Sequence, residues 1–185
     1  MTPEQPVFFY DLGSPECYLV GERVMGELHP VPEWEPVHAA ALGIDLSGGD
    51  REALVAAAAE LGLLPMRWPS VWPADTERAM LTATWAKRGG RAVAYSQAAF
   101  RQAFAGGRDL GDEGTVLIAA AACEMHPTAV LKGMTLRATT GALAAANERA
   151  REMGVTALPA LAVGHERFTG PDCLAQAQTA LTRAS

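Results

Sequence analysis

The spacing of apolar residues changes twice along the chain, which divides the sequence into three parts. Near the start, Val7–Tyr10 is a short run of β-branched and aromatic residues that predicts a buried strand. Ser14 and Pro15 then predict the start of a helix that continues as far as His29, with the serine at the N-cap and the proline at the first helical position. A second strand is expected over residues 34–38, which gives a right-handed βαβ unit.

The middle of the chain has the apolar spacing of amphipathic helices. Asp50 can cap a helix that carries Leu54 and Ala58 on one face and ends at Gly62. The next stretch, residues 64–73, contains three prolines and two tryptophans and is therefore expected to be a loop. Further helices are expected after Asp75, around Phe100 and Phe104, from Asp112 to Met125, and from about Met134 to Met153.

Near the C-terminus the pattern changes to that of short strands. Ala160–Val163 is strand-like, and Gly164-His165 fits a two-residue type II′ turn into a returning strand over residues 166–168. A last helix is expected over residues 170–183.

The order of these elements predicts the fold class. A β-α-β unit, a block of helices and a β-β-α unit together indicate an α/β protein with a thioredoxin fold and an all-helical insertion. We expect a thioredoxin-like domain over residues 1–48 and 150–185, with the helical insertion over residues 49–149.

Composition and charge narrow the range of functions. The 185 residues are 49% hydrophobic and 19% charged, as in ordinary soluble globular proteins. The formal charge is 15 − 21 = −6, and no basic cluster offsets it, which argues against a nucleic-acid partner. A helix that crosses a bilayer needs about 18 consecutive apolar residues, and no apolar stretch of this sequence approaches that length. No membrane association is therefore expected.

The cysteines and the N-terminal segment favour a cytoplasmic protein. Cys17, Cys123 and Cys173 are odd in number and widely spaced, which suits reduced thiols. Residues 1–6 lack the basic and apolar pattern of a secretory signal. The four histidines are far apart and have no cysteine or carboxylate at metal-ligand spacing, so no metal site is expected.

The first candidate site is Ser14-Pro15-Glu16-Cys17. Unpaired backbone N–H groups and the helix dipole favour an anion at the mouth of a helix. If a ligand thiolate lies there, the Ser14 hydroxyl can donate a hydrogen bond to it. The alternative is that Ser14 is an N-cap and nothing more.

The second candidate site is Leu158-Pro159, just before the strand at Ala160. A proline at the entrance of a strand is a place where a cis peptide bond can be required. A cis bond would turn the Leu158 backbone toward a cleft, where an extended ligand can pair with it. The alternative is an ordinary trans proline at a strand edge.

Two terminal segments resemble a known family. Phe9-Tyr-Asp-Leu-Gly-Ser-Pro-Glu-Cys-Tyr-Leu19 is similar to the opening motif of 2-hydroxychromene-2-carboxylate isomerases and kappa-class glutathione transferases. Residues 151–172 resemble that family's cis-proline hairpin and following helix, and residues 73–76 and 104–112 resemble segments between them. The likeness covers almost the whole chain and implies a branch of the DsbA-like thioredoxin superfamily.

The resemblance implies roles for individual residues. Ser14 matches the serine that stabilises the glutathione thiolate, and Leu158 and Pro159 match the backbone clamp for its cysteinyl unit. Asp172, in the binding segment that begins at Gly170, matches the carboxylate that holds the γ-glutamyl ammonium.

The family also implies the cofactor and the partners. Asp75 occupies the position of a family asparagine at the ligand site. The implied cofactor is glutathione or another low-molecular-weight thiol, and the implied partner is an electrophilic small molecule. Members of the superfamily often dimerise, which leaves a homodimer as an expectation.

Three functions follow from these observations. The first is a thiol-dependent isomerase or transferase, in which Ser14 holds the ligand thiolate. The second is a thiol–disulfide oxidoreductase acting through Cys17 alone, although a lone thiol cannot form the intramolecular disulfide of dithiol oxidation. The third is a non-catalytic thioredoxin-fold binding protein. It is motivated by Glu16, Asp75 and Thr169, which replace an aromatic residue, an asparagine and a tryptophan that are frequent in the family.

Overall fold

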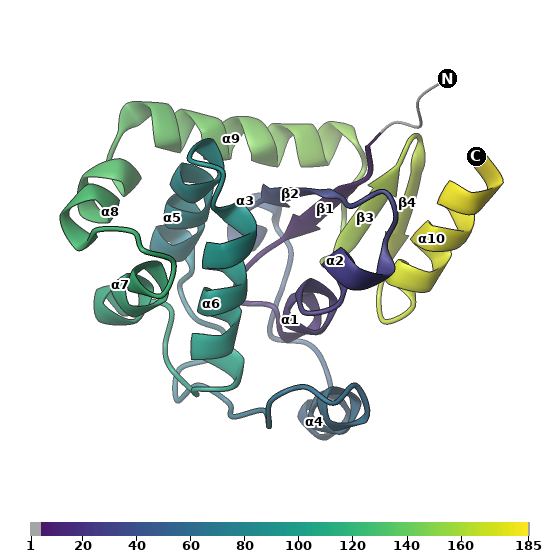
Figure 1. Cartoon of the computed structure of the whole chain (residues 1–185), viewed down its shortest axis with the longest axis horizontal. Coiled ribbons are helices and arrows are strands. Elements are labelled where there is room, and N and C mark those ends of the chain that lie inside the picture. The colour runs from purple at the N-terminus through teal and green to yellow at the C-terminus, as the bar shows by residue number, and fades with distance from the viewer. Residues whose placement is uncertain (1–4, 185) are drawn as a thin grey trace.

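A four-stranded sheet in the order β2-β1-β3-β4 forms the centre of the protein (Figure 1). The computed structural model describes residues 5–184. β1 (Val7–Tyr10) runs parallel to β2 (Glu33–Pro36) and antiparallel to β3 (Ala160–Val163). β3 in turn pairs antiparallel with β4 (Glu166–Thr169). The element order β-α-β, helices and β-β-α is the predicted one.

β1 is buried on both faces, which explains why its sequence is apolar without alternation. Phe8 and Tyr10 point into the larger core cluster, where both rings lie against Trp34 of β2. Val7 and Phe9 point into a smaller cluster on the opposite face. The smaller cluster is covered by α9 (Arg137–Glu152), the long helix along one side of the molecule in Figure 1.

The crossover from β1 to β2 begins as predicted and then departs from the prediction. α1 (Pro15–Gly21) has Ser14 at the N-cap and the proline in its first turn. The prediction of one continuous helix to His29 is wrong, because the helix ends at Gly21 and a separate short helix, α2 (Val24–Glu27), follows it. β2 is followed by another short helix, α3 (Ala39–Leu42), which the sequence did not predict.

Five helices lie between α3 and α9 in the chain. They are α4 (Arg51–Glu60), α5 (Glu77–Arg88), α6 (Ala92–Phe104), α7 (Glu113–Ala121) and α8 (Pro127–Met134). Asp50 and Asp112 cap α4 and α7 as predicted. The helix expected to reach Met125 ends at Ala121, and α8 was not predicted.

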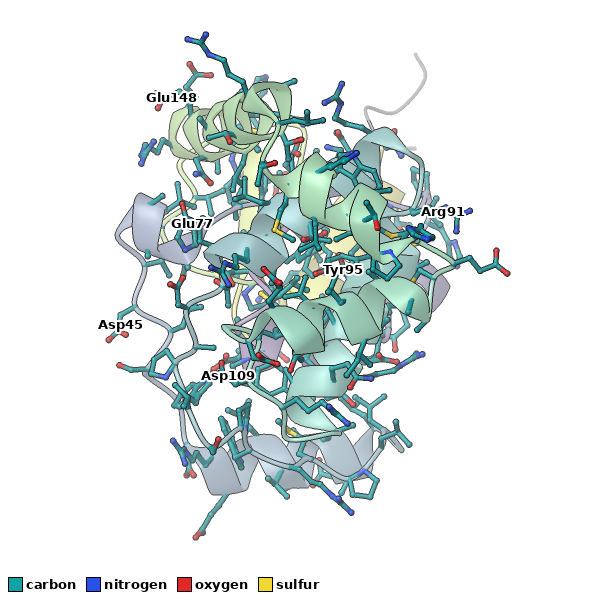
Figure 2. All side chains as sticks on the ribbon, turned by 90° about the vertical axis from the view of Figure 1, so that its left-hand side faces the viewer. Asp45, Glu77, Arg91, Tyr95, Asp109 and Glu148 are labelled. Atoms are coloured by element: carbon teal, nitrogen blue, oxygen red, sulfur yellow. The ribbon has the colours of Figure 1, made fainter. Side chains whose placement is uncertain are left out.

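α5 and α6 pack against the sheet, α7 and α8 pack against other helices, and α4 lies at the periphery. α6 contacts α1 through Phe100 and Phe104, whose rings lie beside Tyr18. Figure 2 shows Tyr95 of α6 inside the helical block, where it is fully buried. α4 lies beyond α1, on the side away from the sheet (Figure 1).

The C-terminal unit follows the prediction closely. Val163 pairs with Glu166, so the hairpin loop has two residues, and Gly164 has a positive φ of 54°. α10 (Cys173–Ala184) then packs against β3 and β4. Within the described part of the chain, no helix has both the length and the apolar character that crossing a membrane requires.

The proposed domain limits stay a prediction. The limit between residues 149 and 150 falls inside α9, near its C-terminal end. Residues 1–4 and 185 of the expected thioredoxin-like domain lie outside the described residues, and so does most of the N-terminal segment used to argue against a secretory signal.

Candidate functional site

Ser14 lies at the N-terminus of α1 and is fully buried. Its Oγ accepts a hydrogen bond of 3.1 Å from the backbone N–H of Cys17, the usual N-cap contact. The same hydroxyl donates to Oε2 of Glu16 at 3.2 Å. The helix mouth therefore already carries an anion, the carboxylate of Glu16, which is itself only partly buried.

The side chain of Asp11 fixes the loop that leads to Ser14. One of its carboxylate oxygens accepts hydrogen bonds of 2.8 Å from the Gly13 N–H and from the Thr76 hydroxyl. The other accepts one of 2.8 Å from the N–H of Ala39. Burial raises the pKa of the Asp11 carboxyl, and these three hydrogen bonds oppose that rise. The aspartate therefore joins the starts of α3 and α5 to the loop before Ser14.

A cavity of about 450 Å³ lies between α1 and α4. α1 contributes Glu16, Leu19 and Val20 to its wall, and the chain after it contributes Arg23. The opposite wall is formed by α4 and the residues before it, among them Gly49, Asp50, Leu54 and Glu60. The end of the cavity is formed by Pro159, Gly170 and Pro171. This volume is within the usual range for small-molecule pockets.

The Leu158–Pro159 peptide bond is cis. Pro159 is buried and lines the cavity, while Leu158 is half-buried and packs against both core clusters. Gly170, with a φ of 80°, connects β4 to the segment before α10, a backbone conformation that favours glycine. The neighbouring Asp172 is exposed just before α10.

The structure brings together some of the predicted site residues but not all of them. Pro159 and Gly170 share one cavity with Glu16, and Ser14 lies behind the Glu16 carboxylate. Leu158 is adjacent in the chain to the cavity wall at Pro159, and Asp172 is adjacent to Pro171. Asp75 instead lines another cavity of about 420 Å³, and Asp11 and His38 line the same cavity.

Cys17 is fully buried one turn inside α1. Burial raises the pKa of its thiol well above the ordinary value, and a hydrogen bond with the Ser14 side chain opposes this only in part. A buried, neutral thiol is a poor nucleophile. Cys123 and Cys173 are also buried, and all three cysteines are free.

The loop that carries Trp68 and Trp72 connects α4 to the residues around Ser14. The Arg51 guanidinium, at the start of α4, lies 4.8 Å from the Trp68 ring and 4.9 Å from the Trp72 ring. Trp72 donates a hydrogen bond of 3.2 Å from its indole N–H to the carbonyl of Gly13 and packs against the larger core. These tryptophans therefore position the wall of the cavity as well as closing the core.

Sequence reasoning missed the part that Glu16 plays. An acidic residue in the first helical turn is expected to interact with the helix dipole, but the carboxylate of Glu16 also covers the Ser14 hydroxyl. An acidic residue two positions after an N-cap serine is the signal that could have indicated this contact. Among residues 5–184, no group of three or more histidine, cysteine or acidic side chains is arranged to hold a metal ion.

Comparison with known proteins gives one family and several similar folds. The family model described as DSBA-like thioredoxin domain matches residues 7–182. No curated protein sequence matches the chain.

Three solved structures illustrate the likeness. A 2-hydroxychromene-2-carboxylate isomerase superimposes with a TM-score of 0.84 at 18% identity, over 98% of this chain and 96% of the other. A probable DsbA oxidoreductase from Streptomyces coelicolor gives a TM-score of 0.74 at 20% identity, over 97% and 89% of the two chains. The cytosolic disulfide reductase DsbM from Pseudomonas aeruginosa, solved with GSH, gives 0.65 at 13% identity, over 97% and 100%. At these identities the likeness establishes the fold.

Proposed function

Because this chain belongs to the DSBA-like thioredoxin domain family, we propose that it binds a small reduced thiol in the cavity between α1 and α4. The thiol would be glutathione or another low-molecular-weight thiol, and it would serve as the nucleophile of an isomerase or a transferase. Its sulfur would lie at the mouth of α1, beside Ser14 and opposite Pro159.

The observation that carries this proposal is the contact between Ser14 and Glu16. A buried hydroxyl at a helix N-terminus donates to an anionic oxygen at 3.2 Å, so this place stabilises negative charge. Glu16 is partly exposed, and a rotation of its side chain would free the hydroxyl for a ligand. A ligand thiolate can then take the position of the carboxylate oxygen.

The energy of such a contact is large enough to ionise a thiol near neutral pH. A hydrogen bond to a charged acceptor contributes about 1.5–3 kcal/mol. At about 1.4 kcal/mol per unit, this lowers a thiol pKa from about 8.5 to about 7. The resulting thiolate is the nucleophilic form.

The isomerase reaction needs only the thiol and the unsaturated substrate, because the thiol is regenerated at the end. The thiolate sulfur adds to the β-carbon of an unsaturated carbonyl compound, forming a C–S bond and moving the double-bond electrons into an enolate. Rotation about the former double bond follows. The enolate then reforms the double bond and expels the thiolate, which is regenerated.

Redox chemistry through Cys17 is less well supported. The thiol has no exposed surface, and its raised pKa keeps it protonated. We also propose a cytoplasmic location, because a reducing compartment would keep a small thiol and the three free cysteines reduced.

Thermal-shift measurements with reduced thiols test the proposal. Glutathione, other small thiols and their alcohol analogues are added to wild type, Ser14→Ala and the exposed serine control Ser47→Ala. A thiol at about 100 times its dissociation constant should stabilise wild type and Ser47→Ala by about 2.7 kcal/mol. Ser14→Ala should weaken thiol binding by about tenfold or more, since it removes a charge-assisted hydrogen bond.

The quantity to compare is the increase in stability that the ligand causes in each protein, because loss of the N-cap alone lowers stability by about 1 kcal/mol. Equal increments in wild type and Ser14→Ala would contradict the proposal. Thiol binding without faster thiol addition to an enone would identify a non-catalytic binding protein instead.

A further inference from the structure

We infer that the cavity between α1 and α4 selects thiols that are neutral or positively charged and carry an apolar body, in preference to anionic thiols such as glutathione. The inference rests on the thiol-binding function proposed above and names the class of ligand. It follows from the charges and the shape of the cavity wall.

The charged residues of the wall are mostly acidic. Glu16, Asp50 and Glu60 line the cavity together with one cation, Arg23. The Arg23 guanidinium forms a bidentate pair with Glu27, with N–O distances of 2.8 and 2.7 Å. Its charge is therefore balanced by a carboxylate outside the cavity wall, and the remaining charged side chains of the wall are all acidic.

Glu16 is built into the end of the cavity where the sulfur would bind. A β-carbon on Gly49 would lie 2.9 Å from Oε1 of Glu16, so the carboxylate is accommodated because residue 49 has no side chain. Gly49 also has a φ of 112°, which favours glycine. When a ligand displaces Glu16 from the Ser14 hydroxyl, the carboxylate remains tethered close to the ligand.

The rest of the wall is apolar. Leu19 and Val20 of α1 face Leu54 and Leu61 at α4 across the cavity, and Pro171 lies at its end. Such a wall gains free energy by covering an alkyl or aryl body. Among residues 5–184, the wall provides no unpaired cation for the two carboxylates of glutathione.

These features combine into a prediction of selectivity. Each carboxylate of the wall repels a negative ligand group and attracts a positive one, and partial exposure to water weakens both effects. We expect a neutral thiol to bind about tenfold more tightly than an anionic thiol of the same length, and a cationic one at least as tightly as the neutral one.

Three thiols of equal chain length test the inference: aminohexanethiol, mercaptohexanol and mercaptohexanoate. Their thiol groups are alike, and their remote ends are cationic, neutral and anionic at pH 7. Dissociation constants are measured by calorimetry for wild type at low and at high salt, with glutathione and aminohexanol alongside. The preference against mercaptohexanoate should shrink as salt rises.

Two variants of α4 provide a matched comparison. Glu60→Gln removes a carboxylate from the cavity wall, whereas Glu52→Gln removes an exposed carboxylate of the same helix that is not part of the wall. Glu60→Gln should reduce the neutral-to-anionic ratio by about threefold, and Glu52→Gln should leave it unchanged. This outcome supports the inference.

The remaining outcomes separate the two proposals. Mercaptohexanoate or glutathione binding as tightly as mercaptohexanol, with dependence on Ser14, would overturn the charge selection and leave the proposed function standing. Aminohexanol binding as tightly as aminohexanethiol, unaffected by Ser14→Ala, would overturn both, and so would the failure of every thiol to bind.

Discussion

At Ser14, a single hydroxyl links two groups within one turn of helix. It accepts from the Cys17 N–H and donates to Glu16. The residue at position 14 therefore determines which atom meets a ligand, while the sulfur of Cys17 stays buried beneath it. A sulfur at position 14 would change the chemistry of the site.

The variant Ser14→Cys should convert the protein into a dithiol oxidoreductase. Its thiol would lie at a helix N-terminus, which lowers a cysteine pKa, and next to the thiol of Cys17 in a C-x-x-C arrangement. We expect oxidised glutathione to produce an intramolecular disulfide, detected by mass spectrometry as the loss of two hydrogens. The variant should also catalyse the reduction of insulin disulfides by dithiothreitol, which wild type should not.

Ser47→Cys is the control for this experiment, because residue 47 is exposed and lies outside the turn that contains Cys17. It should form only a mixed disulfide with glutathione. If wild type reduces insulin as fast as Ser14→Cys does, Cys17 alone is reactive, and the interpretation of its burial is wrong.

At the scale of elements, an ion network joins α5 and α9, which are far apart in the sequence, to the edge strand β2. Glu33 and Glu35 are two residues apart along β2 and therefore point to the same side of the sheet. Lys87 of α5 contacts them at 2.8 and 2.6 Å, and Arg149 of α9 contacts them at 3.1 and 2.5 Å. Burial raises the pKa of Glu33, but hydrogen bonds from Lys87 and Arg149 outweigh it, and the pKa falls below its ordinary value.

Glu35→Gln should lower the free energy of unfolding by about 1–3 kcal/mol, measured by urea titration at pH 7. The reason is that Glu35 is largely buried and its loss leaves two cations without a full counter-charge. The exposed pair of Glu166 and Arg183 provides the control, since Glu166→Gln should cost less than about 1 kcal/mol. Equal effects would mean that the network contributes no more than a surface pair.

The network also contributes to the pH dependence of the same titration. A glutamate whose folded-state pKa is lowered stabilises the protein above its unfolded-state pKa, near 4.5, and this stabilisation is lost as pH falls through the folded-state value. Wild-type stability should therefore fall below about pH 4.5. Lys87→Met, which removes one partner of Glu33, should show a smaller fall over that window.

Local signals in the sequence predicted the elements that local interactions form. The apolar run of β1, the Ser14-Pro15 start of α1 and the two-residue turn at Gly164 each depend on neighbouring residues, and the structure has all three. The contacts of Glu33 with Lys87 and Arg149 depend on residues far apart in the chain. No periodicity encodes such pairs.

The same distinction applies to the candidate site. The helix N-terminus at Ser14 and the proline at 159 were identified from the sequence. Pro159 lines the cavity, and Ser14 lies behind the Glu16 carboxylate that lines the same cavity. The covering of Ser14 by Glu16, and the use of α4 as the opposite wall, depend on side-chain direction and on helix placement. A motif comparison cannot supply either of these.

At the scale of the whole molecule, the cavity separates a well-packed body from a peripheral helix. α1 contributes Cys17, Tyr18 and Val20 to the larger core. The buried residues of α4, Leu54 and Ala58, lie outside both core clusters of the described residues, and Val55 on the same helix is 39% exposed. An element with little buried apolar contact opens at a lower free energy than the rest of the fold.

We therefore predict that α4 opens locally and that a ligand in the cavity suppresses this opening. Backbone amides of α4 should exchange with deuterium faster than those of α6, whose apolar face is buried in the larger core. Mercaptohexanol should slow exchange in α4 more than in α6, because only α4 gains a new packing surface.

Two leucine variants distinguish local from global opening. Leu161→Ala, in the central strand β3 and fully buried, should lower the global free energy of unfolding by about 3 kcal/mol. Leu54→Ala should lower it by about 1 kcal/mol or less, yet accelerate exchange throughout α4. Comparable global losses from both variants would show that α4 unfolds together with the core. Thiol binding would then occur in a preformed cavity and would require Glu16 to leave the Ser14 hydroxyl.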